Sequence, residues 1–144
     1  MSYLQEKVQK AWYYQRPLNA KGGETLDKLT GIGHVGIVVQ TDKGNKYLIH
    51  SGPGNGCVAT DAKNMSNQWK MQEELQVKWN PTISECLQAA GVWLSHFIDN
   101  NTPGVQYWAG LLCYGSASRL KELLANPDYF KQKGEAYIFA SELP

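Results

Sequence analysis

The side chains best suited to nucleophilic catalysis in this chain of 144 residues are those of its three cysteines and three histidines. A cysteine becomes a good nucleophile when its pKa is lowered, and both a nearby imidazole and the start of a helix lower it. Cys113 fits best, because it follows an apolar segment, residues 109–112, and stands where a helix running to about Ala125 is expected to begin. The helix dipole would stabilise its thiolate, and its N–H is a candidate oxyanion donor.

The other two cysteines are weaker candidates. Cys86 falls one turn into an expected helix, beside its apolar stripe, which predicts a buried core thiol. Cys57 follows a glycine-rich segment and has no helix start that would lower its pKa. Because buried free cysteines are common, a chain in which no cysteine is catalytic stays open as the alternative.

Two histidines lie on β-branched runs that predict a β-hairpin. The first run covers residues 34–40 and the second covers residues 46–51, and Gly44 between them suits a left-handed turn position. Gly44 favours a three-residue loop, residues 42–44. The odd-numbered positions of the first run are all Val or Ile and form the expected core face.

The register of this hairpin decides whether the imidazoles of His34 and His50 meet. With a three-residue loop, Gly36 pairs with His50, and His34 becomes a diagonal neighbour of His50 on the same face, about 7–8 Å away between backbones. A loop of even length would place the two imidazoles on opposite faces. Both can also be ordinary structural histidines of the sheet. Gly36 has no side chain, so Gly36→Leu is expected to block the site at nearly unchanged stability.

The order of these motifs resembles the circularly permuted branch of the papain-like (NlpC-like) superfamily. The motifs are His34-Val-Gly-Ile, then Tyr47-Leu-Ile-His50, then a cysteine that opens a helix. This branch includes the lecithin:retinol acyltransferase-like proteins and the H-Ras-like-suppressor phospholipase/acyltransferases. The resemblance implies Cys113 as nucleophile, His34 as general base and His50 as the polar third member that orients it. It also implies a permuted papain-like α+β fold, with an antiparallel β-sheet packed against helices.

The chain departs from that branch next to the cysteine. Leu112 stands where Asn is usual, and Tyr114 stands where an acidic residue or His is usual. A looser similarity, over roughly residues 30–125, is to small uncharacterised animal proteins. It rests on residues 47–52 (YLIHSG), 61–69 (DAKNMSNQW) and 113–120 (CYGSASRL).

The implied activity is that of a thiol-dependent acyl hydrolase or acyltransferase. It would act on an ester, amide or thioester of a small molecule, lipid or peptide and pass through an acyl-enzyme. One alternative is a papain-like scaffold with an idle triad that serves as a binding module, and another is a hydrolase of cell-wall or protein amides. Several aromatic side chains suit a ligand groove or a partner surface if they are not core residues: Trp12, Tyr13, Tyr14, Trp69, Trp79, Tyr107 and Trp108.

The remaining elements would position this site in one domain, residues 1–144. Residues 2–12 are expected to form a short helix, and residues 74–79 alternate like a half-exposed strand. Thr82 and Glu85 form a capping-box pattern that opens a helix with an apolar stripe of period near 3.6. Further expected elements are a loop at residues 18–31, a short strand at 57–62 and a final strand at 135–140.

Composition and charge exclude several classes of partner. Hydrophobic residues make up 42% of the chain and charged residues 19%, which is a globular balance. The net charge is +1, with Lys and Arg scattered among Asp and Glu, so no nucleic-acid partner is expected. No run of about 18 apolar residues is present, so no membrane span is expected.

The cysteine count and the N-terminal residues indicate a cytoplasmic protein. An odd number of cysteines without a secretory signal peptide favours reduced thiols over a disulfide framework. The cysteine spacing matches no zinc template, so neither a metal nor another cofactor is expected.

Overall fold

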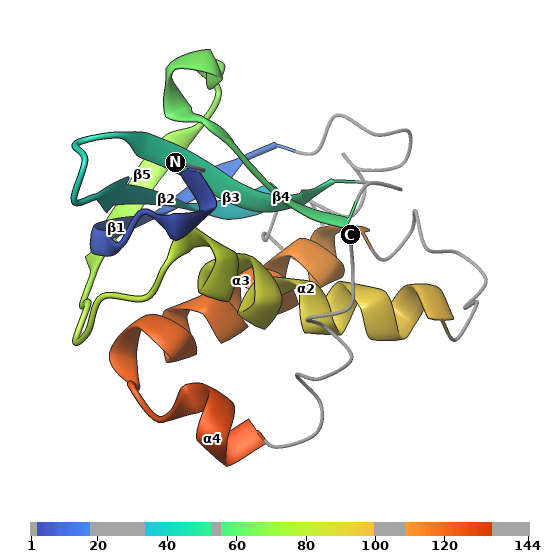
Figure 1. Ribbon diagram of the computed structural model, residues 1–144. Helices are drawn as coiled ribbons and strands as arrows, with labels where there is room; N and C mark the ends of the chain where they lie inside the picture. Colours follow the sequence, from blue (N-terminus) through green and yellow to red (C-terminus); the bar gives the residue numbers. More distant parts are fainter. Residues whose placement is uncertain (1–2, 18–33, 53–55, 100–108, 134–144) are drawn as a thin grey trace.

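The computed structural model describes residues 3–17, 34–52, 56–99 and 109–133 (Figure 1). Within these segments, the description leaves out the side chains of residues 51–52, 56, 92–99, 109–114 and 133. The loop expected at residues 18–31, the strand expected at residues 135–140, and both Tyr107 and Trp108 fall outside the described residues.

Within the described segments, five antiparallel strands form one sheet with the order β4-β3-β2-β1-β5. The strands are β1 (Val8–Arg16), β2 (His34–Thr41), β3 (Lys46–Gly52), β4 (Gly56–Asp61) and β5 (Lys70–Leu75). The predicted α+β class with an antiparallel sheet is therefore confirmed, and the short strand expected after residue 56 is present as β4.

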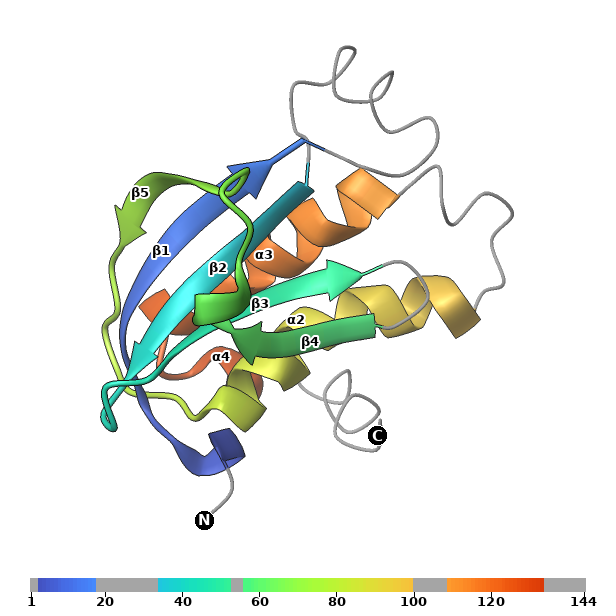
Figure 2. The same ribbon diagram turned by 90° about the horizontal axis from the view of Figure 1, so that it is seen from above.

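Two long helices cover one face of this sheet, as Figures 1 and 2 show. They are α2 (Ile83–Asp99) and α3 (Ala109–Ala125), and a short α4 (Tyr129–Lys133) follows. Two 3-10 turns are also present, η1 (Tyr3–Gln5) and η2 (Ala62–Asn64). Apolar burial between the helices and the sheet forms the main core. This core includes Val8, Ala11, Val35, Ile37, Val39, Ile49, Ile83, Cys86, Ala90, Leu120, Leu123 and Leu124.

The hairpin of β2 and β3 has the register predicted for a three-residue loop. Ile37 pairs with Ile49, and the N–H of Thr41 donates to the carbonyl of Asn45 at 2.9 Å. Gly44 has a φ of 79°, the left-handed conformation that this loop requires and that other residues rarely adopt. The local turn therefore sets which side chains of the two strands share a face.

The predicted start of α2 is also confirmed. The N–H of Glu85 donates to Oγ1 of Thr82 at 3.1 Å, and the N–H of Thr82 donates to Oε1 of Glu85 at 3.0 Å. This reciprocal pair satisfies two N–H groups that the first turn of a helix leaves unpaired. Such a cap contributes about 1 kcal/mol to stability.

The prediction of a helix over residues 2–12 is wrong, because only the turn η1 forms there and β1 begins at Val8. The apolar residues Val8 and Ala11 have helix-like spacing, and both are fully buried. The pairing of β1 with β2 has a register shift between Val8 and Lys10. Because of this shift, the side chains of Val8 and Ala11 both point to the core although the two residues belong to a strand. Strand partners on both sides then satisfy the backbone of β1.

The strand expected at residues 74–79 lies earlier, at β5, and ends at Leu75. β5 is an edge strand with almost all its side chains exposed, so its sequence carries no apolar face that would predict it. After Leu75 the chain binds to α3 instead. The N–H of Lys78 donates to the carbonyl of Leu124 at 2.8 Å, and Nε1 of Trp79 donates to that of Leu123 at 2.6 Å.

A second, smaller apolar cluster covers the face of the sheet that points away from α2 and α3. Trp69 packs there on Val38 and Leu48, with Trp12, Tyr14, Ala62 and Met65 around them. Figure 2 shows the η2 segment crossing over β2 and β3 on this side. Even-numbered side chains of β2 point to this face, so the cluster around Trp69 covers part of the face that carries the histidines.

Candidate active site

His34 and His50 meet on this second face. His34 begins β2 and His50 lies near the end of β3, and the hairpin register makes them diagonal neighbours as predicted. The Nε2 atom of His34 is 3.0 Å from the Nδ1 atom of His50, a hydrogen-bonding distance. The two rings are nearly perpendicular, with an angle of 84° between their planes. His34 is 4% exposed, and His50 is half-buried.

Trp69 contacts both imidazoles. Its ring centroid is 5.3 Å from that of His34 and 5.9 Å from that of His50. The indole is itself 9% exposed, so it limits the rotation of both imidazoles. The sequence marked Trp69 only as one of several aromatic residues and as the end of the segment 61–69. Its place beside the histidines depends on how η2 folds back over the sheet.

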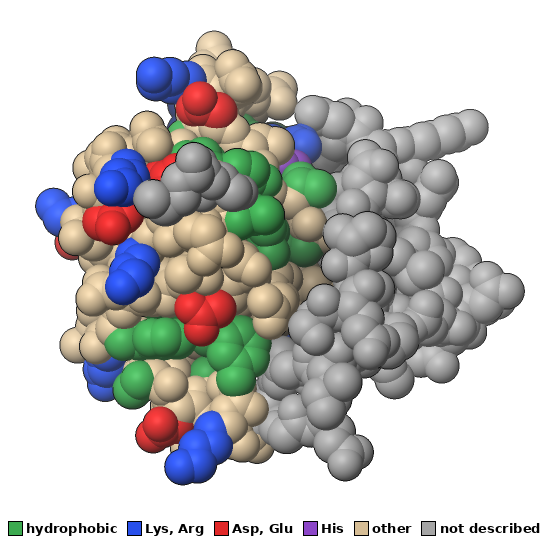
Figure 3. Space-filling view, in the orientation of Figure 1, with side chains coloured by type: hydrophobic (Ala, Val, Ile, Leu, Met, Phe, Trp, Pro, Cys, Tyr) green, Lys and Arg blue, Asp and Glu red, His purple; other side chains and the backbone are tan. Residues whose placement is uncertain are grey.

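Arg16 is a site residue that the sequence analysis missed. It ends β1 directly opposite His34 in the β1–β2 register. Its guanidinium carbon lies 5.0 Å from the centroid of the Trp69 ring, and its NH1 group donates to the carbonyl of Pro17 at 3.0 Å. Figure 3 shows histidine surface directly beside basic surface at the upper edge of the described part. No sequence signal links Arg16 to the histidines, because strand pairing alone brings them together.

Both imidazoles are held neutral. Burial is the main cause that lowers the pKa of His34 to about 3, and the positive charge of Arg16 and the proximity of His50 add to this shift. Burial, followed by Arg16, also lowers the pKa of His50. At neutral pH, one imidazole of the pair therefore donates its N–H and the other accepts it.

The position of Cys113 differs from the prediction in one respect. Helix α3 starts at Ala109, one turn before Cys113, because residues 109–112 join the helix. Three of these four residues, Ala109, Leu111 and Leu112, are strong helix formers, which favours the earlier start despite Gly110. Only the first turn of a helix has unpaired N–H groups, so the N–H of Cys113 lies past the positions that would bind an oxyanion. The predicted helix end at Ala125 is confirmed.

The side chain of Cys113 lies outside the described part of the structure. Its backbone belongs to α3, which packs against β2. Figure 2 shows the first turn of α3 at the end of the sheet where β2 begins, which is the end that carries His34. The imidazoles of His34 and His50 pack against Trp69 on the opposite face from α3. A thiol from α3 would therefore have to meet His34 around the end of β2.

The other two cysteines are buried thiols. Cys86 is fully buried in the main core, as predicted, and burial raises its pKa far above the usual range. Burial raises the pKa of Cys57 to about 12, although Arg119 nearby opposes the shift. Neither thiol forms a thiolate at neutral pH, which leaves Cys113 as the candidate.

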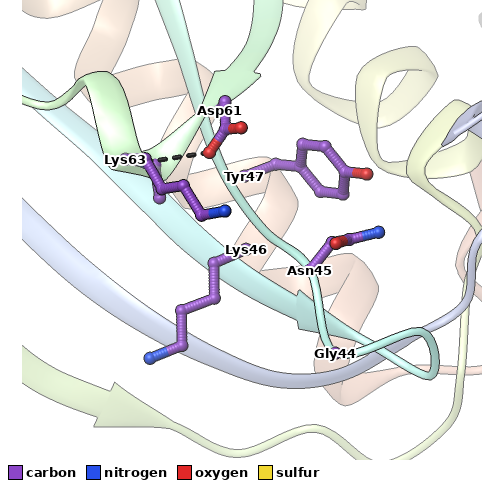
Figure 4. Close-up of a pocket in the computed structure, with 7 residues that line it drawn as sticks. Gly44, Asn45, Lys46, Tyr47, Asp61 and Lys63 are labelled. Carbon is purple, nitrogen blue, oxygen red and sulfur yellow. Dashed lines mark hydrogen bonds between the residues drawn. The ribbon is translucent and has the colours of Figure 1, made fainter.

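A separate pocket of about 400 Å³ lies at the turn of the β2–β3 hairpin (Figure 4). Gly44, Asn45, Lys46, Tyr47, Asp61, Ala62 and Lys63 line it. Figure 4 shows Asn45 and Tyr47 pointing to one side of β3 and Lys46 pointing to the other. This pocket contains no thiol or imidazole, so it is not where the predicted chemistry would occur.

The carboxylate of Glu6 is bound beside this pocket by three neutral side chains. Thr41 Oγ1 donates to it at 2.6 Å, Tyr47 Oη at 2.8 Å and Asn45 Nδ2 at 3.0 Å. The hydrogen bond from Thr41 is the main reason that the pKa of Glu6 is lowered. Burial and Glu6 raise the pKa of Tyr47 to about 12. These bonds tie the N-terminal turn to the hairpin, which is a structural role.

Two further observations concern the described residues only. They contain no group of three or more His, Cys, Asp or Glu side chains placed to hold a metal ion. None of their helices combines the length and hydropathy needed to cross a bilayer.

The chain matches no protein-family model and no solved structure. It is similar to the uncharacterized protein R800 of Acanthamoeba polyphaga mimivirus, with 26% identity over 125 residues. The similar region covers 86% of this chain and 98% of the viral protein. The two chains are therefore similar over most of their lengths, and the name of the viral protein states no activity.

Proposed function

We propose that this protein is a thiol-dependent acyl hydrolase or acyltransferase of the permuted papain-like kind. In this proposal Cys113 is the nucleophile, His34 is the general base and His50 orients His34. The observation that carries the proposal is the 3.0 Å contact between Nε2 of His34 and Nδ1 of His50. An imidazole that acts as a base needs a neighbour that holds its ring in one orientation and one tautomer.

The choice of nitrogen atoms supports this division of roles. His34 uses Nε2 to meet His50, so its Nδ1 is the nitrogen that does not face His50. When Nε2 of His34 carries the proton and donates to Nδ1 of His50, Nδ1 of His34 has a lone pair that accepts the thiol proton. The hydrogen bond is compatible with a proton on either nitrogen, and the proposed mechanism requires it on Nε2 of His34.

The reaction proceeds through a thioester. Nδ1 of His34 takes the proton from Sγ of Cys113, and the thiolate forms a bond to the carbonyl carbon of the substrate. The bond to the leaving group breaks, and the leaving group takes the proton back from His34. Water, deprotonated by His34, then attacks the thioester and releases the acid and the free thiol. In an acyltransferase an amine or alcohol replaces the water.

A binding module with an idle triad is the second candidate, and a specific observation favours it. Burial and Arg16 lower the pKa of His34 to about 3, which disfavours the imidazolium that a thiolate–imidazolium pair needs. A thiolate close to Nδ1 would raise this pKa again, since opposite charges stabilise each other. The reactivity of the thiol therefore separates the two candidates.

The deciding experiment is alkylation by iodoacetamide as a function of pH, followed by peptide mass spectrometry of each cysteine. For an enzyme, we expect Cys113 to react with a midpoint well below the value of about 8.5 for an unperturbed thiol. The His34→Ala variant should lose this shift, because the base and counter-ion are gone. Cys57 and Cys86 serve as internal controls, since their raised pKa values predict slow labelling.

Two results would contradict the proposal. One is labelling of Cys113 no faster than that of a thiol in an unfolded peptide, and the other is a rate that His34→Ala leaves unchanged. Either result would favour the binding module. If the thiol is reactive, incubation with a thioester and a mass measurement of the acyl-enzyme, chased with water or with an amine, separates a hydrolase from an acyltransferase.

A further inference from the structure

The segment that joins β4 to β5 crosses the whole sheet on the face that carries the histidines. These two strands are the opposite edges of the sheet, so residues 62–69 pass over β3, β2 and β1. Figure 1 shows η2 standing out from the sheet on the side away from α2 and α3, and Figure 2 shows it over β2 and β3. We call residues 62–69 the crossing segment.

The crossing segment is longer than its path requires. Asp61 is level with Ala11 in the strand pairing and Lys70 pairs with Gln15, so the path covers four inter-strand spacings and four residues along the strands. This diagonal amounts to roughly 23 Å. The nine Cα–Cα steps from Asp61 to Lys70 reach about 30 Å when the chain is extended. The segment can therefore rise from the sheet while both edge strands keep their register.

Few side chains hold the crossing segment to the sheet. Of its eight residues, only Ala62, Met65 and Trp69 are buried or half-buried, and the other five are exposed. The three belong to the apolar cluster that includes Val38 and Leu48 of the sheet. The guanidinium of Arg16 adds one cation–π contact to the ring of Trp69.

The hydrogen bonds of the crossing segment are local. The N–H of Met65 donates to the carbonyl of Ala62 at 3.1 Å, the N–H of Trp69 donates to that of Ser66 at 3.3 Å, and the cap of η2 is equally local. Within the part of the chain that the structure describes, no hydrogen bond joins the segment to the strands beneath it. Lifting the segment would therefore leave the hydrogen bonds of the sheet intact.

In the observed arrangement Trp69 closes this face over the histidine pair. The indole contacts both imidazoles and is itself only 9% exposed, and His34 is only 4% exposed. A molecule that approaches from this face reaches the imidazole of His34 only after Trp69 has moved. A base that has to exchange protons with a thiol and with water needs such access.

We propose that residues 62–69 form a lid that opens without unfolding of the sheet and controls access to His34 and His50. Lids of this kind admit a substrate when open and separate the reacting groups from bulk water when closed. The regulatory meaning of the lid rests on the proposed function, because it assumes that His34 is the general base. Its opening depends only on the packing described above.

Amide hydrogen exchange of the wild type tests the opening without any substitution. We expect the amides of Met65 and Trp69 to be protected at least about 100-fold less than the ladder amides of β2 and β3. Their exchange should also stay constant in low concentrations of urea, because a local opening exposes little surface, whereas exchange of the ladder amides should rise. Equal protection and equal urea dependence would show that the segment opens only when the whole protein unfolds.

Labelling with diethyl pyrocarbonate tests the access to the histidines. A neutral imidazole nitrogen attacks a carbonyl carbon of the reagent, an N–C bond forms, and the ring proton leaves with the other half as ethanol and carbon dioxide. Both imidazoles are neutral at pH 7, so the rate at each histidine, read by peptide mass spectrometry, reports access rather than protonation.

Trp69→Leu should raise the labelling rates of His34 and His50 about tenfold, because leucine remains apolar but loses the ring contacts. The matched control is Met71→Ala, which shortens an apolar side chain that is 53% exposed just beyond the lid and should leave both rates unchanged. Circular dichroism checks that each variant is folded.

Unchanged labelling of both histidines in folded Trp69→Leu would overturn the proposal, as would the equal protection described for hydrogen exchange. An equal increase in Met71→Ala would also overturn it, since the effect would then not belong to the lid. Neither measurement uses Cys113. An unreactive Cys113 would therefore count against the proposed function alone, and a failure of the lid would leave the test of the thiol unaffected.

Discussion

The Nε2 atom of His34 lies 3.0 Å from the Nδ1 atom of His50, although the two residues are 16 positions apart in the chain. The three-residue turn of the hairpin places them on one face, and Trp69 restricts both rings. Because burial keeps both imidazoles neutral, the pair shares a single N–H between the two nitrogen atoms. The protonation of one histidine therefore constrains the tautomer of the other.

His50 should affect thiol reactivity less than His34 does. In the proposed mechanism, His50 orients the base and does not touch the sulfur. His50→Ala should slow iodoacetamide labelling of Cys113 near neutral pH by about two- to tenfold, whereas His34→Ala should remove the enhancement. His50→Gln should recover part of the rate, because its amide oxygen can accept the N–H of His34. A larger loss in His50→Ala than in His34→Ala would reverse the two roles.

The imidazole of His34 should stay neutral far below the usual histidine pKa. Its pKa in the folded protein is about 3, against 6.5 for an unperturbed histidine. An NMR titration of the imidazole signals should therefore show no midpoint for His34 near 6.5. In Arg16→Gln the midpoint should rise, since the positive charge that opposes protonation is gone. A midpoint near 6.5 in the wild type would mean that the imidazole is not buried in solution.

The same shift predicts how stability depends on pH. Between about pH 6.5 and pH 3 the unfolded chain protonates His34 and the folded chain does not, so the unfolded state binds more protons. The free energy of unfolding should therefore be highest above pH 6.5 and fall as the pH decreases, by up to about 1.4 kcal/mol per pH unit for this histidine. Urea unfolding of the wild type and of His34→Gln at several pH values measures this dependence. An equal change of the free energy of unfolding with pH in the two proteins would contradict the prediction.

Gly36→Ala should disturb the histidine pair and lower stability. A Cβ at Gly36 would lie 2.9 Å from Cδ1 of Leu48 and 3.1 Å from Cβ of His50. The expectation that Gly36→Leu leaves stability nearly unchanged is therefore wrong, since Leu48 and Trp69 cover this face. We expect Gly36→Ala to cost about 1–3 kcal/mol in urea unfolding and to shift the NMR signals of His50. Unchanged stability would indicate that this face is loosely packed.

Glu6 should stabilise the fold by tying the N-terminal turn to the hairpin. Glu6→Gln replaces one oxygen that accepts these hydrogen bonds with an N–H₂ donor, and we expect a loss of about 1–3 kcal/mol in urea unfolding. Tyr47→Phe removes a single donor and should cost less. The pKa of Glu6 is lowered in the folded state, so its contribution is present above pH 4.5 and is lost as the pH falls through the folded pKa.

Glu74→Gln is the control for this prediction, because it removes an exposed carboxylate from the edge strand β5. Its stability should stay close to that of the wild type. Equal losses in Glu6→Gln and Glu74→Gln would show that overall charge, rather than these hydrogen bonds, is responsible.

The sequence by itself determined the elements whose signals are local. The turn at Gly44 sets the register of β2 and β3, and this register puts His34 and His50 on one face. The capping box of Thr82 and Glu85 marks the start of α2 in the same way. The turn and the helix cap each depend on hydrogen bonds or dihedral angles of residues only a few positions apart. The sequence by itself is therefore enough to predict them.

Only the tertiary structure decided the elements that depend on distant partners. Residues of β1 have the spacing of a helix but form a strand, because β2 and β5 on either side satisfy its backbone and a register shift turns Val8 and Ala11 to the core. The same pairing brings Arg16 to His34, and the crossing of η2 brings Trp69 to both histidines. These contacts join residues far apart in the chain, and their free energy comes from burial and pairing that no local pattern records.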